Sequence, residues 1–157
     1  RQLILADVIG LNPVSLGDNI LIDKGEKDGL KEGDIVVAAG NILVGRISQV
    51  FTTSAKATLI SNSMSRVDAL IQETRIRGII KGKANYGLLM DWLALNEEIK
   101  PDQAIITSGL SDLFPAGLLI GRIEQVIFNE SDVFKKAEIE PAVDFEKLEK
   151  VFIIRWP

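Results

Sequence analysis

Two stretches of almost the same sequence restrict the folding of this chain more than any other feature. Leu43–Val50 reads LVGRISQV and Leu119–Val126 reads LIGRIEQV, so six of eight positions are identical. Gly45 corresponds to Gly121 at an offset of 76 residues, whereas Gly40, just upstream, corresponds to Gly109 at an offset of 69. The second copy therefore carries seven extra residues, within Ser111–Gly117 (SDLFPAG). We interpret the pair as an internal duplication with one insertion.

Short apolar segments rich in β-branched residues recur along the chain, and Gly, Pro, Asn and Asp separate them. This pattern is typical of strands joined by turns in an all-β sandwich or barrel. Helical signals are weak: Val143–Lys150 is expected to make a turn or two, and Asp91–Glu98 is the weaker of the two candidates. The twelve predicted strands are Leu3–Gly10, Ile20–Asp23, Ile35–Ala39, Leu43–Phe51, Lys56–Ile60, Val67–Gln72, Ile76–Gly82, Leu88–Ala94, Gln103–Thr107, Leu118–Phe128, Phe134–Glu140 and Val151–Trp156.

Each half of the duplication holds six of these strands. An open sheet of that size exposes two edges, and closing it into a barrel removes them. The sequence therefore predicts an all-β fold that is a tandem of two small six-stranded β-barrels, residues 1–75 and 76–157. It leaves open whether the last strand completes the second barrel or returns to the first.

Four glycines are expected to have structural roles. Gly45 and Gly121 lie inside strands, where a missing side chain permits a sharp bend or the close approach of another backbone. Gly109 and Gly117 belong to a turn-rich loop, which also contains Phe114 and Pro115. Because a buried Phe stabilises a fold by roughly 1.5–3 kcal/mol, we expect this loop to pack against its neighbour barrel.

The composition removes several classes of function. The chain has no His and no Cys, so it lacks imidazole bases, His and Cys ligands for zinc, and disulfides. A net charge of −4 argues against nucleic-acid binding, and the acidic clusters lack the spacing of a calcium loop. Ser108 could act as a nucleophile only with a Lys base such as Lys100, and we favour a turn hydrogen bond for its hydroxyl. We predict no catalytic, metal or cofactor-binding residue.

One strand carries a concentration of cations. At a period of two, Arg75, Arg77, Lys81 and Lys83 fall on one side, and Ile76, Gly78, Ile80 and Gly82 on the other. Such a side is either a solvated face that protects a sheet edge or a patch for an acidic partner or anionic lipid. Together with Phe114 and Pro115, these four cations are the candidate partner-binding residues.

Several motifs in this order resemble the MreC family of bacterial rod shape-determining proteins. They are Ala6–Gly10 (ADVIG), Asn12-Pro13, Ile22–Asp34 with IDKG and DGLKEGD, and VGRI in the fourth strand. RIRGIIKG at Arg75–Gly82 follows, and TSGLSDLFPAGLLIGRI at Thr107–Ile123 is the most specific part. The chain departs from the family pattern at Leu16, where an aromatic is common, and at Asp102-Gln103, where a Gly-Asp pair is common.

The resemblance implies a non-enzymatic scaffold of the cell-elongation complex that organises peptidoglycan synthesis. It implies a place on the extracytoplasmic (periplasmic) face of the inner membrane, with a membrane helix and a coiled coil upstream of Arg1. The implied partners are the elongation penicillin-binding protein (a transpeptidase), MreD and MreB, and self-association as a dimer or filament. The alternatives that the residues leave open are a degenerate chymotrypsin-like double-barrel hydrolase and an envelope glycan- or lipid-binding module.

Overall fold

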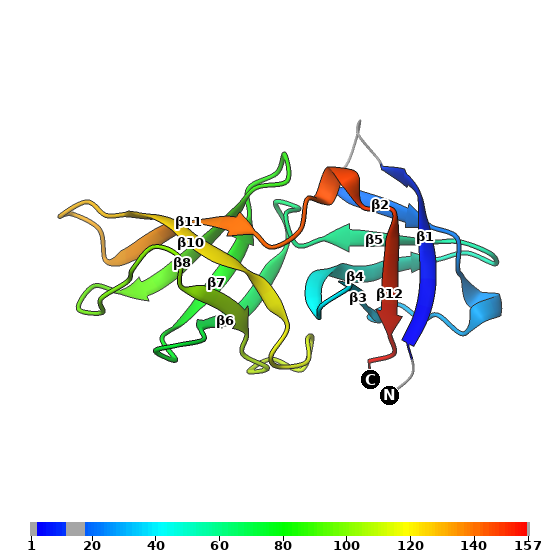
Figure 1. Ribbon diagram of the computed structural model, residues 1–157, viewed down its shortest axis with the longest axis horizontal. Coiled ribbons are helices and arrows are strands. Elements are labelled where there is room, and N and C mark those ends of the chain that lie inside the picture. The colour runs from blue at the N-terminus through cyan, green and yellow to red at the C-terminus, as the bar shows by residue number, and fades with distance from the viewer. Residues whose placement is uncertain (1–2, 12–17, 157) are drawn as a thin grey trace.

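The computed structural model describes residues 3–11 and 18–156, and strands dominate it (Figure 1). Every predicted strand overlaps an observed one, so the prediction of an all-β fold is confirmed. The Asn12-Pro13 motif and Leu16 lie outside the described residues. The strands are β1 (Leu3–Leu11), β2 (Asn19–Ile22), β3 (Ile35–Ala38), β4 (Ile42–Val50), β5 (Ala55–Leu59), β6 (Arg66–Ile71), β7 (Arg77–Gly82), β8 (Leu88–Ala94), β9 (Ala104–Thr107), β10 (Leu119–Ile127), β11 (Phe134–Pro141) and β12 (Lys150–Ile154), and two 3₁₀ helices span Glu26–Asp28 and Phe145–Lys147.

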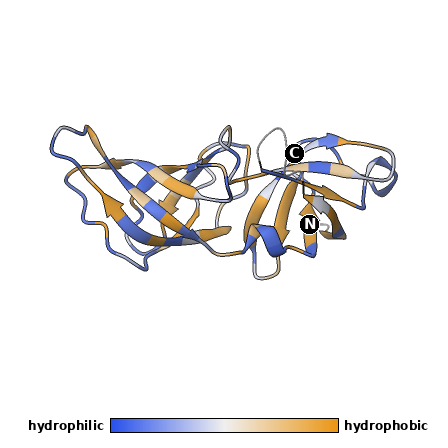
Figure 2. Cartoon of the chain, turned by 90° about the horizontal axis from the view of Figure 1, so that it is seen from above, coloured by the Kyte–Doolittle hydropathy of each residue, from blue (hydrophilic) through white to orange (hydrophobic). Residues whose placement is uncertain are grey.

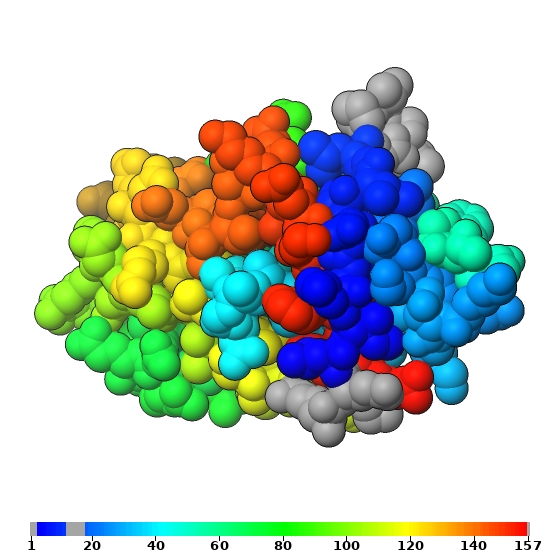
Figure 3. All heavy atoms as spheres, turned by 45° about the vertical axis from the view of Figure 1, so that its right-hand side comes forward, coloured from blue at the N-terminus to red at the C-terminus, as the bar shows by residue number. Residues whose placement is uncertain are grey.

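Six strands form a closed barrel, here called the first barrel. Their order is β4-β3-β12-β1-β2-β5, and β5 pairs back with β4. The last strand of the chain therefore returns to the first, where it pairs with β1 on one side and β3 on the other. The space-filling view shows this arrangement as red C-terminal residues lying beside the blue N-terminal strand (Figure 3).

The other six strands, here called the second set, lie beside the first barrel and give the molecule its elongated shape (Figure 1). Their order is β11-β8-β7-β6-β9-β10, and β10 also pairs with β11. Strand β6 belongs to this set because it pairs with β7 and β9. A division of the chain at residue 75 falls between β6 and β7, so it separates two hydrogen-bonded neighbours.

Residues that are equivalent in the two copies of the duplication also pair in the same way in the structure. In the first barrel Val36 pairs with Gly45 and Val37 with Leu43. In the second set Ile105 pairs with Gly121 and Ile106 with Leu119. These pairs correspond at the two offsets found in the sequence. In the same way β3 corresponds to β9, and β12, which pairs with β3, corresponds to β6, which pairs with β9. The final strand of each half of the sequence therefore pairs with strands of the other half.

Gly45 and Gly121 lie where another backbone comes very close. A Cβ atom on Gly45 would stand 2.2 Å from the carbonyl oxygen of Thr58, and one on Gly121 would stand 2.2 Å from that of Glu140. No side chain fits at such a distance. The two copies thus need glycine for one reason, which is the close approach of the neighbouring strand's backbone.

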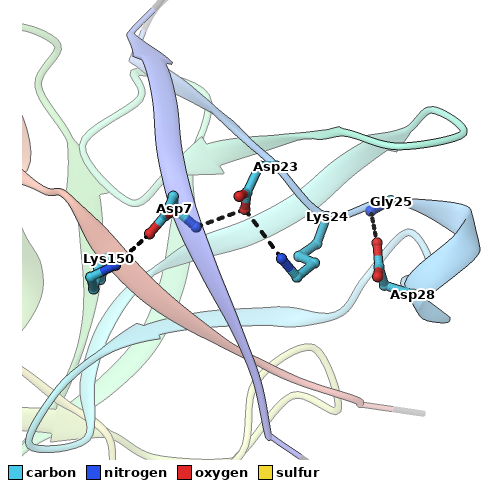
Figure 4. A network of polar contacts seen from close by, with 6 residues as sticks. All are labelled: Asp7, Asp23, Lys24, Gly25, Asp28 and Lys150. Atoms are coloured by element: carbon cyan, nitrogen blue, oxygen red, sulfur yellow. Dashed lines mark hydrogen bonds and ion pairs between the residues drawn. The ribbon is translucent and has the colours of Figure 1, made fainter.

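Aliphatic side chains fill the interior of both sets, and polar residues alternate with them along the strands (Figure 2). Outside the first barrel, a polar network fastens the chain ends together (Figure 4). Lys150 Nζ on β12 lies 2.7 Å from Asp7 Oδ1 on β1, and the backbone N–H of Asp7 donates to Asp23 Oδ1 at 2.7 Å. Hydrogen bonding from Lys150 lowers the pKa of Asp7, so the pair stays charged at neutral pH.

Candidate protein-interaction surface

Strand β7 has the two faces that the sequence predicts. Ile80 is completely buried, and Gly78 packs against Met90 and Leu93 on the inner side. Arg77 is exposed on the outer side, and Lys81 is partly exposed. Arg75 precedes the strand in a turn, where it has a left-handed backbone with φ of 65°.

An exposed tryptophan stands next to these cations. Trp92, on the neighbouring strand β8, is 56% exposed and has φ of 63°. Lys81 Nζ lies 5.8 Å from the centre of its ring, within the range of a cation–π interaction. Asp91 fixes both groups, because one carboxylate oxygen accepts from Lys81 Nζ at 2.9 Å and the other accepts from the Trp92 backbone N–H at 2.7 Å.

Ion pairs divide the four predicted cations into two kinds. Lys81 is paired with Asp91, and Lys83 Nζ lies 2.7 Å from Glu138 Oε2. Among the ion pairs of the described residues, none includes Arg75 or Arg77. Arg77 therefore supplies an unpaired positive charge beside Trp92, on a cavity that Asp68 also lines. Arg75 lies instead among Glu73, Glu97 and Glu98 around another cavity.

A cavity of about 260 Å³ opens beside Trp92. Arg77 and Ile79 of β7, Asp68 of β6, and Ser108 and Leu110 after β9 line it together with Trp92. Leu110 is one of the most exposed apolar residues of the chain. We call the surface formed by Arg77, Ile79, Lys81, Trp92 and Leu110 the Trp92 face.

Ser108 has the role in a turn that the sequence suggests. Its hydroxyl oxygen accepts a hydrogen bond from the Leu110 N–H at 3.2 Å, and its own N–H donates to Asp68 O at 3.0 Å. Lys100, the base considered for it, has its Nζ 3.8 Å from Glu98 Oε1. Within the part of the chain that the structure describes, no group of three or more acidic residues could hold a metal ion.

Asp91 gives the Trp92 face a measurable pH dependence. Burial acts to raise its pKa, but hydrogen bonds from Lys81 and from the Trp92 N–H, with the charges of Lys81 and Lys136, outweigh burial and leave the pKa below its ordinary value. A carboxyl group whose pKa is lower in the folded chain than in the unfolded chain stabilises the fold at any pH above its unfolded pKa of about 4. This contribution is lost as the pH falls through the folded pKa.

We therefore expect Asp91→Asn to lower the thermal midpoint at pH 7, and the difference from wild type to shrink below about pH 4. Glu138→Gln is the control, because it breaks the more exposed ion pair with Lys83 and should change the midpoint little. Thermal unfolding followed by circular dichroism from pH 7 to pH 2.5 measures both. A difference for Asp91→Asn that stays constant over this range would contradict the assignment.

The loop with the seven extra residues, here called the inserted loop (Ser111–Gly117), folds against the first barrel. Phe114 is only 7% exposed and belongs to the hydrophobic core, and Pro115 is also buried. Trp156, which follows β12, donates its indole N–H to Asp112 O at 2.6 Å. Gly109, just before the loop, and Gly117, its last residue, have left-handed backbones with φ of 72° and 88°. Its exposed apolar side chain is Leu113 rather than Phe114.

Sequence reasoning placed Arg77 and Lys81 on the outer face of β7, but Arg75 and Lys83 lie outside this strand, and Trp92 was missed. Strand β8 looked like an ordinary apolar segment, and alternation alone gave no reason to treat its tryptophan as exposed. One signal was present, because only two tryptophans occur in the chain and exposed tryptophans are over-represented at binding hot spots. Charge and aromatic character together identify the surface better than charge alone.

None of the helical residues in 3–11 and 18–156 forms a segment long and apolar enough to cross a membrane. The sequence model of the family described as "Rod shape-determining protein MreC, barrel core" matches residues 8–155. A cell shape-determining protein MreC from Listeria monocytogenes is 34% identical over 155 residues, which cover 96% of this chain and 52% of that protein. The chain spans about half the length of this curated relative.

Solved structures agree with the sequence match. The crystal structure of MreC from Pseudomonas aeruginosa has a TM-score of 0.94 at 25% identity and covers 99% of this chain and 100% of that one. A chain from a complex between Penicillin-Binding Protein (PBP2) and MreC of Helicobacter pylori shares the fold, with a TM-score of 0.69 at 15% identity, over 98% of this chain and 99% of that one. The family-wide match and the duplicated barrel strands lead to one conclusion, that this chain belongs to the MreC family of rod shape-determining proteins.

Proposed function

We propose that this chain is a non-enzymatic scaffold module of bacterial cell elongation, which binds and organises a peptidoglycan synthase. Membership of the MreC family carries the proposal. The Helicobacter relative occurs in a complex with a penicillin-binding protein, so an elongation transpeptidase of the same class is the partner that we propose here. The Trp92 face offers this chain a surface for such a contact.

We also infer that the second set closes as a barrel of its own, so that the molecule is a tandem of two six-stranded barrels. The pairing of β10 with β11 supports this, because it joins the two ends of the set. The strand pairings favour one body of β1–β5 with β12 and another of β6–β11. A single parallel residue pair, Leu119 with Ile42, links β10 to β4 between them.

The Trp92 face has the composition of a protein-binding hot spot. Tryptophan and arginine are the residues most enriched at such sites, and both occur here beside exposed leucine. The unpaired charge of Arg77 favours an acidic counterpart and speeds the encounter with it. The buried positions of Phe114 and Pro115 limit their contact with a partner, so we assign the binding part of the inserted loop to its exposed neighbours.

The test is the affinity of this chain for the extracytoplasmic region of the elongation transpeptidase from the same bacterium. Trp92→Ala should weaken binding roughly 30-fold, which is the effect of removing a typical hot-spot residue. Arg75→Glu with Arg77→Glu should slow association and make it less sensitive to salt. All variants should keep the thermal midpoint of the wild type, because these side chains are exposed.

Two controls match these changes on the first barrel. Phe51→Ala removes another exposed aromatic, and Lys31→Glu reverses an exposed charge. Surface plasmon resonance of all variants gives the rates. Full affinity in Trp92→Ala would remove the Trp92 face from the interface, and a large fall in the midpoint of the arginine variants would show that those residues are structural.

Self-association, as a dimer or filament, is proposed for a different surface. The outer side of β1 exposes four large aliphatic residues, Leu3, Leu5, Ile9 and Leu11. Asp7, paired with Lys150, lies between Leu5 and Ile9 on this side, and the aliphatic residues around it are typical of an interface with a polar element. Leu5→Glu with Ile9→Glu should shift the assembly towards monomer in sedimentation equilibrium, whereas Val133→Glu, on an exposed hairpin tip, should not. An unchanged assembly in the double variant would exclude this side of β1.

The remaining parts of the proposed role concern the longer protein. We propose that it is anchored in the inner membrane with this region on the extracytoplasmic side, and that it contacts MreD and MreB. About half the length of the curated Listeria relative matches this chain, which leaves room for further segments in the longer protein. Site-directed cross-linking in cells with the full-length protein would test the contacts, and protease accessibility in spheroplasts would test the side of the membrane.

A further inference from the structure

A second cavity lies where the inserted loop meets the first barrel. Its volume is about 330 Å³, and it is separate from the Trp92 face. Arg46, Ser48 and Thr58 of β4 and β5 form one wall, and Leu113 and Phe114 of the inserted loop form another. Arg66 and its neighbours, at the start of β6, complete the lining. The seven extra residues of the second copy thus create a cavity on the first.

The duplication shows what the inserted loop does to Arg46. Its counterpart Arg122 is exposed, and one of its guanidinium nitrogens donates to Asp102 O at 2.9 Å. Arg46 is only partly exposed, and its buried Nε has no hydrogen-bond partner among the described residues. The guanidinium group is thus short of one acceptor, so its part that lines the cavity favours an acceptor there, above all a charged one.

The charges around the cavity are of one sign. Its lining contains two arginines, three residues with hydroxyl groups and no carboxylate. No ion pair between described residues includes Arg46 or Arg66. Arg66 is held in place, since its Nη1 donates to Ser63 O at 2.9 Å and to Ser65 O at 2.7 Å. This positive cavity belongs to a chain whose net charge is −4.

The rest of the lining is apolar. Phe114 and Ile60 are buried at its base, and Met64, a flexible side chain that adapts to different shapes, is fully accessible. A volume of this size is at the lower limit of small-molecule pockets and suits one or two amino-acid side chains. We propose that the cavity binds a peptide segment of a partner protein that presents a carboxylate side chain next to an aliphatic one.

The test uses two peptides that differ only in charge. The probe is acetyl-Leu-Asp-Leu-amide and its neutral match is acetyl-Leu-Asn-Leu-amide, each titrated into the ¹⁵N-labelled chain. The Asp peptide should cause saturable shifts of the Ser48, Thr58 and Ser65 amide signals, with an affinity roughly ten-fold above that of the Asn peptide. The preference should fall as salt is raised, because it depends on charge.

Variants connect the binding to the arginines. Arg46→Gln and Arg66→Gln should each remove most of the preference for the Asp peptide, and Arg66, which is exposed, can be replaced without risk to folding. Arg122→Gln, at the equivalent position of the second copy, should leave the preference for the Asp peptide unchanged. Equal affinities for the two peptides, shifts that avoid the cavity, or no saturable shift at about 20 mM peptide would overturn the proposal. Because Trp92→Ala leaves this cavity untouched, the outcome is independent of the transpeptidase experiment.

Discussion

Truncation of the chain after Glu149, which removes β12, is expected to unfold the first barrel. This strand lies between β1 and β3 and joins them through five and three paired positions. Val151, Ile153 and Ile154 are all buried and are at most 2% exposed. Burying three such side chains contributes about 5–9 kcal/mol, against a total stability of about 5–15 kcal/mol for a domain.

Hydrogen exchange followed by NMR measures this result strand by strand. Amides of β1 and β3 should lose protection in the truncated chain, and a peptide with the sequence of β12 added in trans should restore part of it. Strands β7 and β8 serve as the internal control, because β12 does not pair with them. Wild-type protection of β1 and β3 after truncation would show that the barrel closes without its final strand.

Phe114→Ala should lower the free energy of unfolding by about 3–5 kcal/mol, as for other fully buried phenylalanines. Phe114 is 7% exposed and fastens the inserted loop to the core. The adjacent Leu113 is 46% exposed, so Leu113→Ala is the matched control and should change stability by less than about 1 kcal/mol. Urea unfolding of both variants compares them.

The same pair of variants separates packing from recognition. If Phe114→Ala folds as stably as wild type but no longer binds its partner, the inserted loop is an interface and the packing assignment is wrong. If Leu113→Ala alone weakens binding, the exposed side of the loop contributes to recognition while Phe114 supports it from beneath.

Local patterns in the sequence were sufficient for the strands themselves. Alternation placed Ile80 inward and Arg77 outward, and the structure confirms both. The duplication predicted the equivalence of Gly45 and Gly121, and at both positions a Cβ atom would stand 2.2 Å from a backbone carbonyl oxygen. The turn role of Ser108 followed from its place before Gly109. These features depend on residues a few positions away or on a repeated segment, and the sequence alone shows both kinds of pattern.

Long-range features were not accessible in this way. The ion pair of Lys83 with Glu138, and the cavity that contains Arg46 and Arg66, join segments that are far apart in the sequence. A period of two identifies which face of a strand is buried, but it carries no information about which strand lies alongside. Charge complementarity and cavity shape therefore emerge only once the strands are placed.

By itself, the sequence determined the all-β class, the position of nearly every strand, the internal duplication and the seven-residue insertion. Only the tertiary structure decided that β12 closes the first barrel and that β6 joins the second set. The reason is physical. The apolar pattern of the last strand in each half fits a place in either set of strands. Its actual place depends on backbone pairing with distant segments. The pairing of β12 with β1, for example, joins residues more than a hundred positions apart.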